Sequence, residues 1–200
     1  MILMFSISIS ESESDQDTDK LFYFDAIVFK GKEPGKARLD IYVSVPYQSL
    51  RFDNIQGTFV SKFDVQITVF KSKNDKVFSD KMEKQIVEED YYIAQGGKGD
   101  MKIIQTILMI NPVEYRITVN LNDKIDNKNF DRKRKISVID FNRYEFSLSG
   151  MMLLSSIEER GENFVITPYI SDNIAKLDDG FFAFFEAYSM NYTDSVDFVF

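Results

Sequence analysis

Apolar and polar residues alternate along three segments of the chain. In KARLDIYVSVPY (36–47) the odd-numbered positions are apolar or aromatic, and most of the even-numbered positions are polar or charged. The same period of two recurs in FDVQITV (63–69) and VEYRITVNL (113–121). Side chains of a β-strand point alternately to its two faces, so each segment predicts a strand with one buried face. The predicted buried set includes Leu39, Ile41, Val43, Phe63, Val65, Ile67, Tyr115, Ile117 and Val119, with Asp64, Gln66 and Thr68 on the opposite face.

Weaker alternation covers residues 22–29, 77–87, 101–110 and 135–141, and turn-forming sequences such as KSKNDK and QGGKGD separate the segments. No segment carries apolar residues at a convincing helical spacing. Many short strands with regular turns are typical of antiparallel sandwiches and barrels. We therefore expect an all-β fold: an immunoglobulin- or fibronectin-III-like antiparallel β-sandwich followed by the start of a second β-domain.

Tyr115 opens one of the alternating strands and follows Pro112 by three residues. In immunoglobulin-like sandwiches a Tyr in this position turns back and hydrogen-bonds the backbone of the preceding loop, an arrangement called the tyrosine corner. An ordinary core aromatic is the alternative, and both interpretations favour a sandwich.

Composition divides the chain into three parts. Residues 1–20 join an apolar run, MILMFSISIS, to an acidic run, ESESDQDTD. We interpret them as a signal-peptide remnant and an acidic linker, with an ordinary first strand as the alternative for the apolar run. Residues 21–149 hold the strand patterns and are the predicted sandwich domain. Residues 150–200 are predicted to be a linker and an incomplete second β-domain, so that the chain is a fragment.

The stretch GFFAFFEAYSM (180–190) is apolar on both faces, which is typical of a central strand. DSVDFVF (194–200) would be its hairpin partner. Unpaired apolar strands recruit other chains. We therefore expect a protein partner or self-association through this Phe-rich strand.

Charge and composition exclude several classes of function. Lys and Arg number 24 and Asp and Glu 32, which gives a net charge of −8. Such a chain repels phosphate backbones, so no nucleic-acid partner is expected, and the basic run at 132–135 is interpreted as a solvated strand entrance. The absence of His and Cys excludes the usual zinc sites and Ser-His-Asp or Cys-His catalysis. We expect no catalytic residue, no cofactor, no metal site and no membrane span.

Three loops carry residues that could form a site. Glu88, Glu89 and Asp90 form a run of carboxylates, but their polar surroundings favour a solvated surface over a glycosidase pair. QGGKGD lacks the spacing and the following helix of a phosphate-binding loop. NDKIDNKNFD offers the oxygen ligands that calcium prefers, although its spacing does not fit an EF-hand; these are Asn122, Asp123, Asp126, Asn127, Asn129 and Asp131, with a weaker set at Asp172, Asp178 and Asp179.

The segments FYFDAIVF, DIYVSVPYQSLRF, INPVEYRITVNLND and FFAFFEAYSM occur in that order along residues 21–200. In this order the chain resembles the N-terminal region of bacterial GWxTD-domain proteins, which are uncharacterised and mostly secreted. The chain has no Trp, so the Gly-Trp-x-Thr-Asp motif that names the family is absent from it. The resemblance implies an extracytoplasmic location, in the periplasm, at the cell surface or secreted, and transfers no catalytic residue.

The leading functional interpretation is a non-catalytic, extracytoplasmic β-sandwich module for protein–protein interaction, adhesion or surface assembly. The alternative is a carbohydrate-binding accessory module of a polysaccharide-acting system, since such modules also have sandwich folds. A sugar platform needs exposed aromatic side chains on one face. The candidate ligand-facing aromatics are Tyr42, Phe70, Tyr47 and Tyr23.

Overall fold

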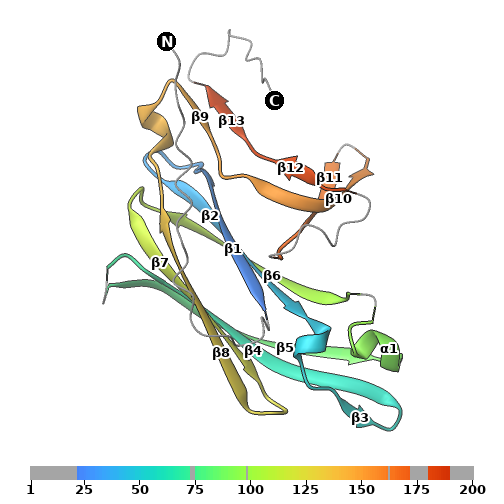
Figure 1. The fold of residues 1–200 in the computed structure, drawn as a ribbon. Coiled ribbons are helices and arrows are strands. Elements are labelled where there is room, and N and C mark those ends of the chain that lie inside the picture. The colour runs from blue at the N-terminus through green and yellow to red at the C-terminus, as the bar shows by residue number, and fades with distance from the viewer. Residues whose placement is uncertain (1–21, 73–74, 98, 162, 172–179, 190–200) are drawn as a thin grey trace.

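The computed structural model describes residues 22–72, 75–97, 99–161, 163–171 and 180–189, which we call the described residues. They fold almost entirely into antiparallel β-strands, so the predicted all-β sandwich is confirmed (Figure 1). None of the helices in this part of the chain has the length and hydrophobicity that crossing a bilayer requires.

The first sheet has three strands in the order β1-β2-β6. These are β1 (Tyr23–Lys30), β2 (Ala37–Pro46) and β6 (Met101–Ile110). β2 is the central strand, and it pairs with β6 over its whole length, from Ala37 opposite Ile110 to Pro46 opposite Met101. β1 and β6 are therefore the two edges of this sheet.

The second sheet has five strands and packs against the first. Its central pair is β4 (Thr58–Phe70) and β7 (Glu114–Asp123). β4 also pairs with the short β3 (Asp53–Ile55) and with β5 (Lys76–Glu88), and β7 also pairs with β8 (Lys128–Ser137). Two short helices lie in the connections between the sheets, η1 (Tyr47–Ser49) after β2 and α1 (Tyr91–Ala94) before β6.

The alternating positions of these strands meet in one core between the two sheets. All nine side chains predicted to be buried are at most 4% exposed, which confirms the predicted register. On the opposite face of β4, Gln66 is exposed and Thr68 is half-buried, as expected. Asp64 on that face is only 2% exposed, because Lys81 and Lys124 cover its carboxylate with ion pairs of 2.8 and 2.5 Å.

The tyrosine corner predicted at Tyr115 is present. The hydroxyl of Tyr115 donates a 3.0 Å hydrogen bond to the carbonyl oxygen of Asn111, four residues upstream, while the ring is buried in the core. The bond holds the turn between β6 and β7 at the point where the chain crosses from one sheet to the other.

A third sheet covers the outer face of the first, as Figure 1 shows for the orange and red strands. Its order is β11-β10-β12, with β10 (Met152–Arg160) in the centre between β11 (Asn163–Pro168) and β12 (Phe182–Phe184). A separate pair joins β9 (Phe146–Leu148) to β13 (Ala187–Ser189), and a short helix, η2 (Phe141–Arg143), precedes β9.

The third sheet and the first share a second hydrophobic cluster. Met152 and Leu154 of β10 pack with Ile27 and Phe29 of β1 and with Tyr42 of β2. The chain passes closely over β1 on its way to β10. The amide of Gly150 donates to the carbonyl oxygen of Val28 at 2.8 Å, and a Cβ at Gly150 would lie 3.0 Å from the Ile27 side chain. β2 is thus buried on both faces, whereas β1 is buried at Ile27 and Phe29 and half-buried elsewhere.

The predicted division into domains is not decided by this packing, and the boundary between residues 149 and 150 stays a prediction. The proposed signal remnant and linker at 1–20 lie outside the described residues, as does DSVDFVF at 194–200. The Phe-rich stretch was predicted to be a central strand, but within the described residues β12 pairs with β10 alone and forms an edge.

Candidate functional site

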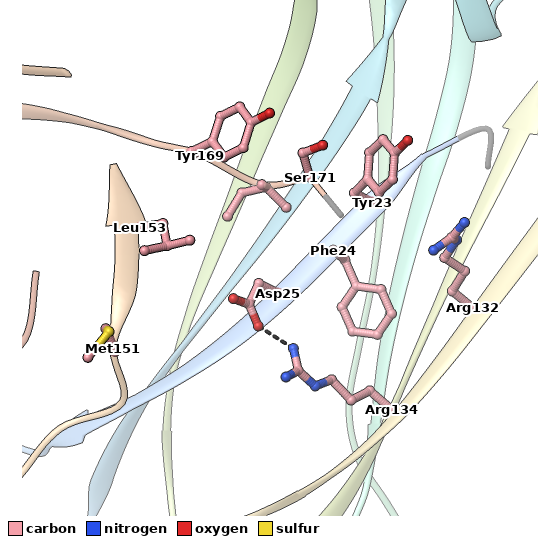
Figure 2. A pocket seen from close by; sticks show the side chains of 10 residues that line it. Tyr23, Phe24, Asp25, Arg132, Arg134, Met151, Leu153, Tyr169 and Ser171 are labelled. Atoms are coloured by element: carbon pink, nitrogen blue, oxygen red, sulfur yellow. Dashed lines mark hydrogen bonds and ion pairs between the residues drawn. The ribbon is translucent and has the colours of Figure 1, made fainter. Parts of the chain in front are cut away.

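A pocket of about 460 Å³ opens along β1, at the side of the sandwich where β8 ends the second sheet. It is lined by residues 23–25 of β1, by Arg132 and Arg134 of β8, and by side chains from residues 151–153 and 169–171. Its volume lies within the range of about 300–1,000 Å³ that is usual for small-molecule sites. Figure 2 shows the two arginines on one side of β1 and Leu153 and Tyr169 on the other.

The strand register explains why the two arginines line this pocket. Arg132 lies opposite Val119 and Arg134 opposite Ile117, and both of these β7 residues point into the core. Residues directly opposite each other share a face of the sheet, so both arginines are on the core-facing side of an edge strand. Lys133, between them, points outward. The interpretation of residues 132–135 as a solvated strand entrance is therefore wrong for Arg132, which is half-buried.

The two guanidinium groups have different partners. Arg134 forms an ion pair with Asp25 of β1 (Figure 2). Arg132 lies over the rings of Phe22 and Tyr23, at 5.5 and 5.6 Å from their centroids, within the range of cation–π contacts. Among the described residues no carboxylate forms an ion pair with Arg132.

Burial shapes the electrostatics of Arg132. Partial removal from water lowers the pKa of Arg132 from its ordinary value, and the nearby Tyr23 opposes this change. An arginine nevertheless stays protonated in proteins. Among the described residues that line the pocket, Asp25 is the only carboxylate, and it is held by Arg134. This arrangement can bind an anion, but it offers no pair of carboxylates for acid–base chemistry.

The structure does not bring the four predicted ligand-facing aromatics together. Tyr42 was expected to be exposed, but it is 6% exposed because the third sheet covers its face of β2. Gln105 donates a 2.9 Å hydrogen bond to the Tyr42 hydroxyl. Burial, with a smaller effect of the Asp40 charge, raises the pKa of Tyr42 to about 12. The expectation of an exposed Tyr42 is therefore wrong.

The other three candidates lie in separate places. Phe70 is half-buried at the end of β4, with the Arg116 guanidinium 4.7 Å from its ring centroid. Tyr47 lies in η1 and contacts Phe52 at 5.8 Å between ring centroids. Tyr23 lines the pocket. Whether any of them binds a ligand stays a prediction, but only Tyr23 lies in this pocket.

The predicted calcium loop joins β7 to β8, and its central carboxylate is already satisfied by the protein. Asp123 is 2% exposed and accepts hydrogen bonds from the backbone amides of Arg51, Ile125 and Asp126, at 2.7, 2.9 and 3.3 Å. Asp126 forms an ion pair with Lys128 at 2.9 Å. Within the ranges that the structure describes, no three acidic side chains are grouped as metal ligands. Asp172, Asp178 and Asp179 of the weaker set lie outside the described residues, so that set stays a prediction.

The carboxylate run after β5 and the Gly-rich loop have local structural roles. Asp90 is exposed and caps α1 by accepting the Tyr92 amide at 2.7 Å, while Glu89 is exposed. Gly97 lies against the Tyr92 ring, where a Cβ would come within 2.3 Å of ring atoms. β6 follows this loop, and a strand does not present the amides that a phosphate needs.

A polar cluster that the sequence did not reveal joins β2 to the chain before and within β13. The guanidinium of Arg38 donates to Asp40 and to Glu186, each at 3.1 Å, and lies 4.2 Å from the Phe29 ring centroid. The Tyr188 hydroxyl donates to Glu186 at 2.6 Å and accepts the Lys30 amide at 3.0 Å.

Burial raises the pKa values of two members of this cluster. For Asp40, the nearby Arg38 acts in the opposite direction. For Tyr188, the hydrogen bond to Glu186 adds to the effect of burial. No signal in the sequence could have found the cluster, because nothing local connects residues 38–40 with residues 186–188.

The comparisons with known proteins do not extend this description. No protein-family model and no curated protein matches the sequence. Among solved structures, the fold is similar to a Bacteroides uniformis β-glucuronidase, with 9% identity and a TM-score of 0.38. It is similar to the same degree, with 10% identity, to a calcium-binding mutant of β-glucuronidase 2 from that organism and to β-glucuronidase 2 bound covalently to cyclophellitol-6-carboxylate aziridine. The match covers 74% of this chain but only 15% of each of theirs, and it assigns the chain neither a family nor an activity.

Proposed function

We propose that this chain is a non-catalytic, extracytoplasmic β-sandwich module that acts in protein–protein interaction, adhesion or surface assembly. The observation that carries the proposal is the edge strand β12. Within the described residues it pairs on one side only, and Phe181 and Phe182 are 50% and 51% exposed. An apolar edge with free backbone groups is a template for a strand from another chain.

The two long edges of the five-stranded sheet differ from β12 in their charge. β5 carries Lys76, Lys81 and Lys84 along its length, and β8 carries Lys128 and the basic run 132–135. Charged side chains on an edge strand discourage pairing with other chains. β12, with the sequence FAF, has no such protection, and we assign the interaction with a partner or a second copy to it.

The proposal includes an immunoglobulin- or fibronectin-III-like assignment. The strand orders β1-β2-β6 and β5-β4-β7-β8 correspond to A-B-E and C′-C-F-G of those sandwiches, and Tyr115 supplies the tyrosine corner on the strand equivalent to F. The extracytoplasmic location and a relation to GWxTD-domain proteins rest on the sequence resemblance alone. The non-catalytic role rests on a composition without His or Cys.

The test is the molar mass of the purified chain as a function of concentration, measured by light scattering after size exclusion. We expect the mass to rise with concentration, and a Phe181→Ser, Phe182→Ser double variant to remain monomeric. A Phe164→Ser variant is the matched control, because Phe164 is 65% exposed on β11, the opposite edge of the same sheet. A wild-type chain that stays monomeric at all concentrations, or a control that behaves like the double variant, contradicts the assignment to β12.

The carbohydrate-binding alternative is favoured by one observation, the position of Tyr23 in the pocket. It predicts that soluble polysaccharides retard the chain in affinity gel electrophoresis and that Tyr23→Ala removes the retardation. Phe70→Ala is the control, since Phe70 lies away from the pocket on β4.

A further inference from the structure

The pocket between β1 and β8 contains more positive than negative charge, although the chain as a whole is acidic. Two guanidinium groups, Arg132 and Arg134, and one carboxylate, Asp25, line it, while the net charge of the chain is −8. The carboxylate is engaged by Arg134. The charge of Arg132 is therefore not compensated by any carboxylate of the described residues.

The surroundings of Arg132 favour the binding of an anion from solution. The side chain is half-buried and lies over two aromatic rings, so its guanidinium plane is held in place while part of its hydration is lost. A fixed, partly desolvated guanidinium presents its donors to a carboxylate with little further loss of side-chain entropy. Arg134 lies two residues along the same strand face, at about 6.6 Å between Cα atoms.

The remaining walls of the pocket are apolar and aromatic. Tyr23 of β1 lies on the side of Leu153, Tyr169 and Ile170, whereas Phe24 packs against the sandwich core on the side of the arginines. A lone inorganic ion would leave these walls unused. A ring fits between aromatic and aliphatic side chains, because aromatic faces stack on rings.

We propose that this pocket binds a small molecule that carries a carboxylate on a six-membered ring, either an aromatic acid or a uronic acid. The carboxylate binds to Arg132, and the ring lies against Tyr23 and the apolar wall of residues 153–170. This assignment does not depend on the proposed association through β12. The competing explanation is that Arg132 only protects the edge of the second sheet, since inward-pointing charges on edge strands prevent pairing with other chains.

The test is a titration of the ¹⁵N-labelled chain followed by NMR. Benzoate is compared with benzamide, and glucuronate with glucose, so that each acid has an uncharged counterpart with the same kind of ring. We expect at least one acid to shift the amides of residues 23–25 and 132–134, and its uncharged counterpart to bind about tenfold to a hundredfold more weakly, as expected for loss of a charged hydrogen bond. The pair that responds identifies the kind of ring.

Three variants separate binding from edge protection. Arg132→Gln should weaken binding of the acid at least about tenfold. Lys135→Gln is the matched control, because it removes the same charge from β8 at an exposed position opposite Arg116. Asp25→Asn should strengthen binding, since it releases Arg134 from its ion pair. Edge protection alone predicts no change in binding for any of the three.

The proposal is overturned if no acid shifts these amides, if each acid and its uncharged counterpart bind equally, or if Arg132→Gln and Lys135→Gln have the same effect. Thermal melts establish that each variant is folded. If Arg132→Gln does not fold, the comparison of acids with uncharged counterparts on the wild-type chain and the response of Asp25→Asn decide the matter.

Discussion

Leu154 connects the third sheet to the sandwich, and its replacement by Ala tests whether the two fold as one unit. The side chain is fully buried in β10, and it packs in the second cluster with Ile27 and Phe29 of β1. Leu154→Ala removes three carbons from a site that the two sheets enclose. The predicted boundary between residues 149 and 150 implies that only the third sheet is destabilised. The shared cluster implies that the first sheet is destabilised as well.

The structure sets the expected magnitudes. Leu→Ala at enclosed sites costs about 2–5 kcal/mol of unfolding free energy, because a cavity remains. If the third sheet detached, Ile27 and Phe29 would lose their cover, at about 1.5–3 kcal/mol for each side chain that returns to water. Detachment is therefore costly for the first sheet as well. We expect one cooperative transition, with a lower midpoint and an unchanged denaturant slope.

The assay combines urea unfolding with hydrogen exchange of individual amides. Ile157→Ala is the matched control on the same strand, because Ile157 is 40% exposed, and it should cost less than about 1 kcal/mol. In Leu154→Ala, the amides of β2 and β10 should lose protection by the same free energy. If protection falls only in β10–β12 while β2 and β4 keep theirs, the reasoning from the shared cluster is refuted and the two-domain division is supported.

Three further outcomes follow from individual side chains. Tyr115→Phe removes the tyrosine-corner hydrogen bond and should lower the free energy of unfolding, measured by urea denaturation, by about 1 kcal/mol. Tyr144→Phe, at an exposed position, should leave it unchanged. Equal effects of the two substitutions would show that the corner hydrogen bond does not stabilise the fold. Burial alone would raise the pKa of Asp64, but Lys124 and Lys81 outweigh burial and lower the pKa. The ionised carboxylate therefore stabilises the fold above its unfolded pKa of about 3.9, and this stabilisation is lost as pH falls through the folded pKa. Asp64→Asn should therefore cost about 1 kcal/mol at pH 7 and less at pH 3, and a cost that is independent of pH would exclude the ion pairs as its source. Thermal melts with and without a chelator should coincide, and a drop of several degrees that Asp123→Asn abolishes would instead establish a calcium site.

The alternation of apolar and polar residues predicts the orientation of a strand correctly where one face of the strand is buried and the other is exposed. Alternation alone predicts Leu39, Ile41 and Val43 in the core, and the spacing from Pro112 makes Tyr115 a candidate for the tyrosine corner beside the alternative of an ordinary core aromatic. Alternation failed for Tyr42, because it assigns the polar side of a strand to solvent. A third sheet that arrives from residues 152–184 covers that side, and no local pattern in β2 reports it.

The candidate site was less accessible to sequence reasoning. Arg132 and Arg134 were read as part of a charged run, although Phe130 and Ile136 share their parity and are apolar. That parity is a signal that the arginines face the core side of the strand. The pocket itself depends on contacts between β1, β8 and residues 151–171, and such long-range contacts follow from tertiary packing, which the strand pattern does not specify.

The pairing of β2 with β6 also determines the order in which a new chain can fold. Ala37 pairs with Ile110, and β3, β4 and β5 are all synthesised between them. At about 5–20 residues per second, β2 leaves the ribosome several seconds before its partner exists. Its inner face, with Leu39, Ile41 and Val43, stays exposed until β4 and β7 have been synthesised. Its outer face stays exposed until β10 has been synthesised. The nascent chain thus exposes for several seconds a strand that is almost entirely buried in the folded protein, and a chaperone that holds β2 should raise the yield of folded protein.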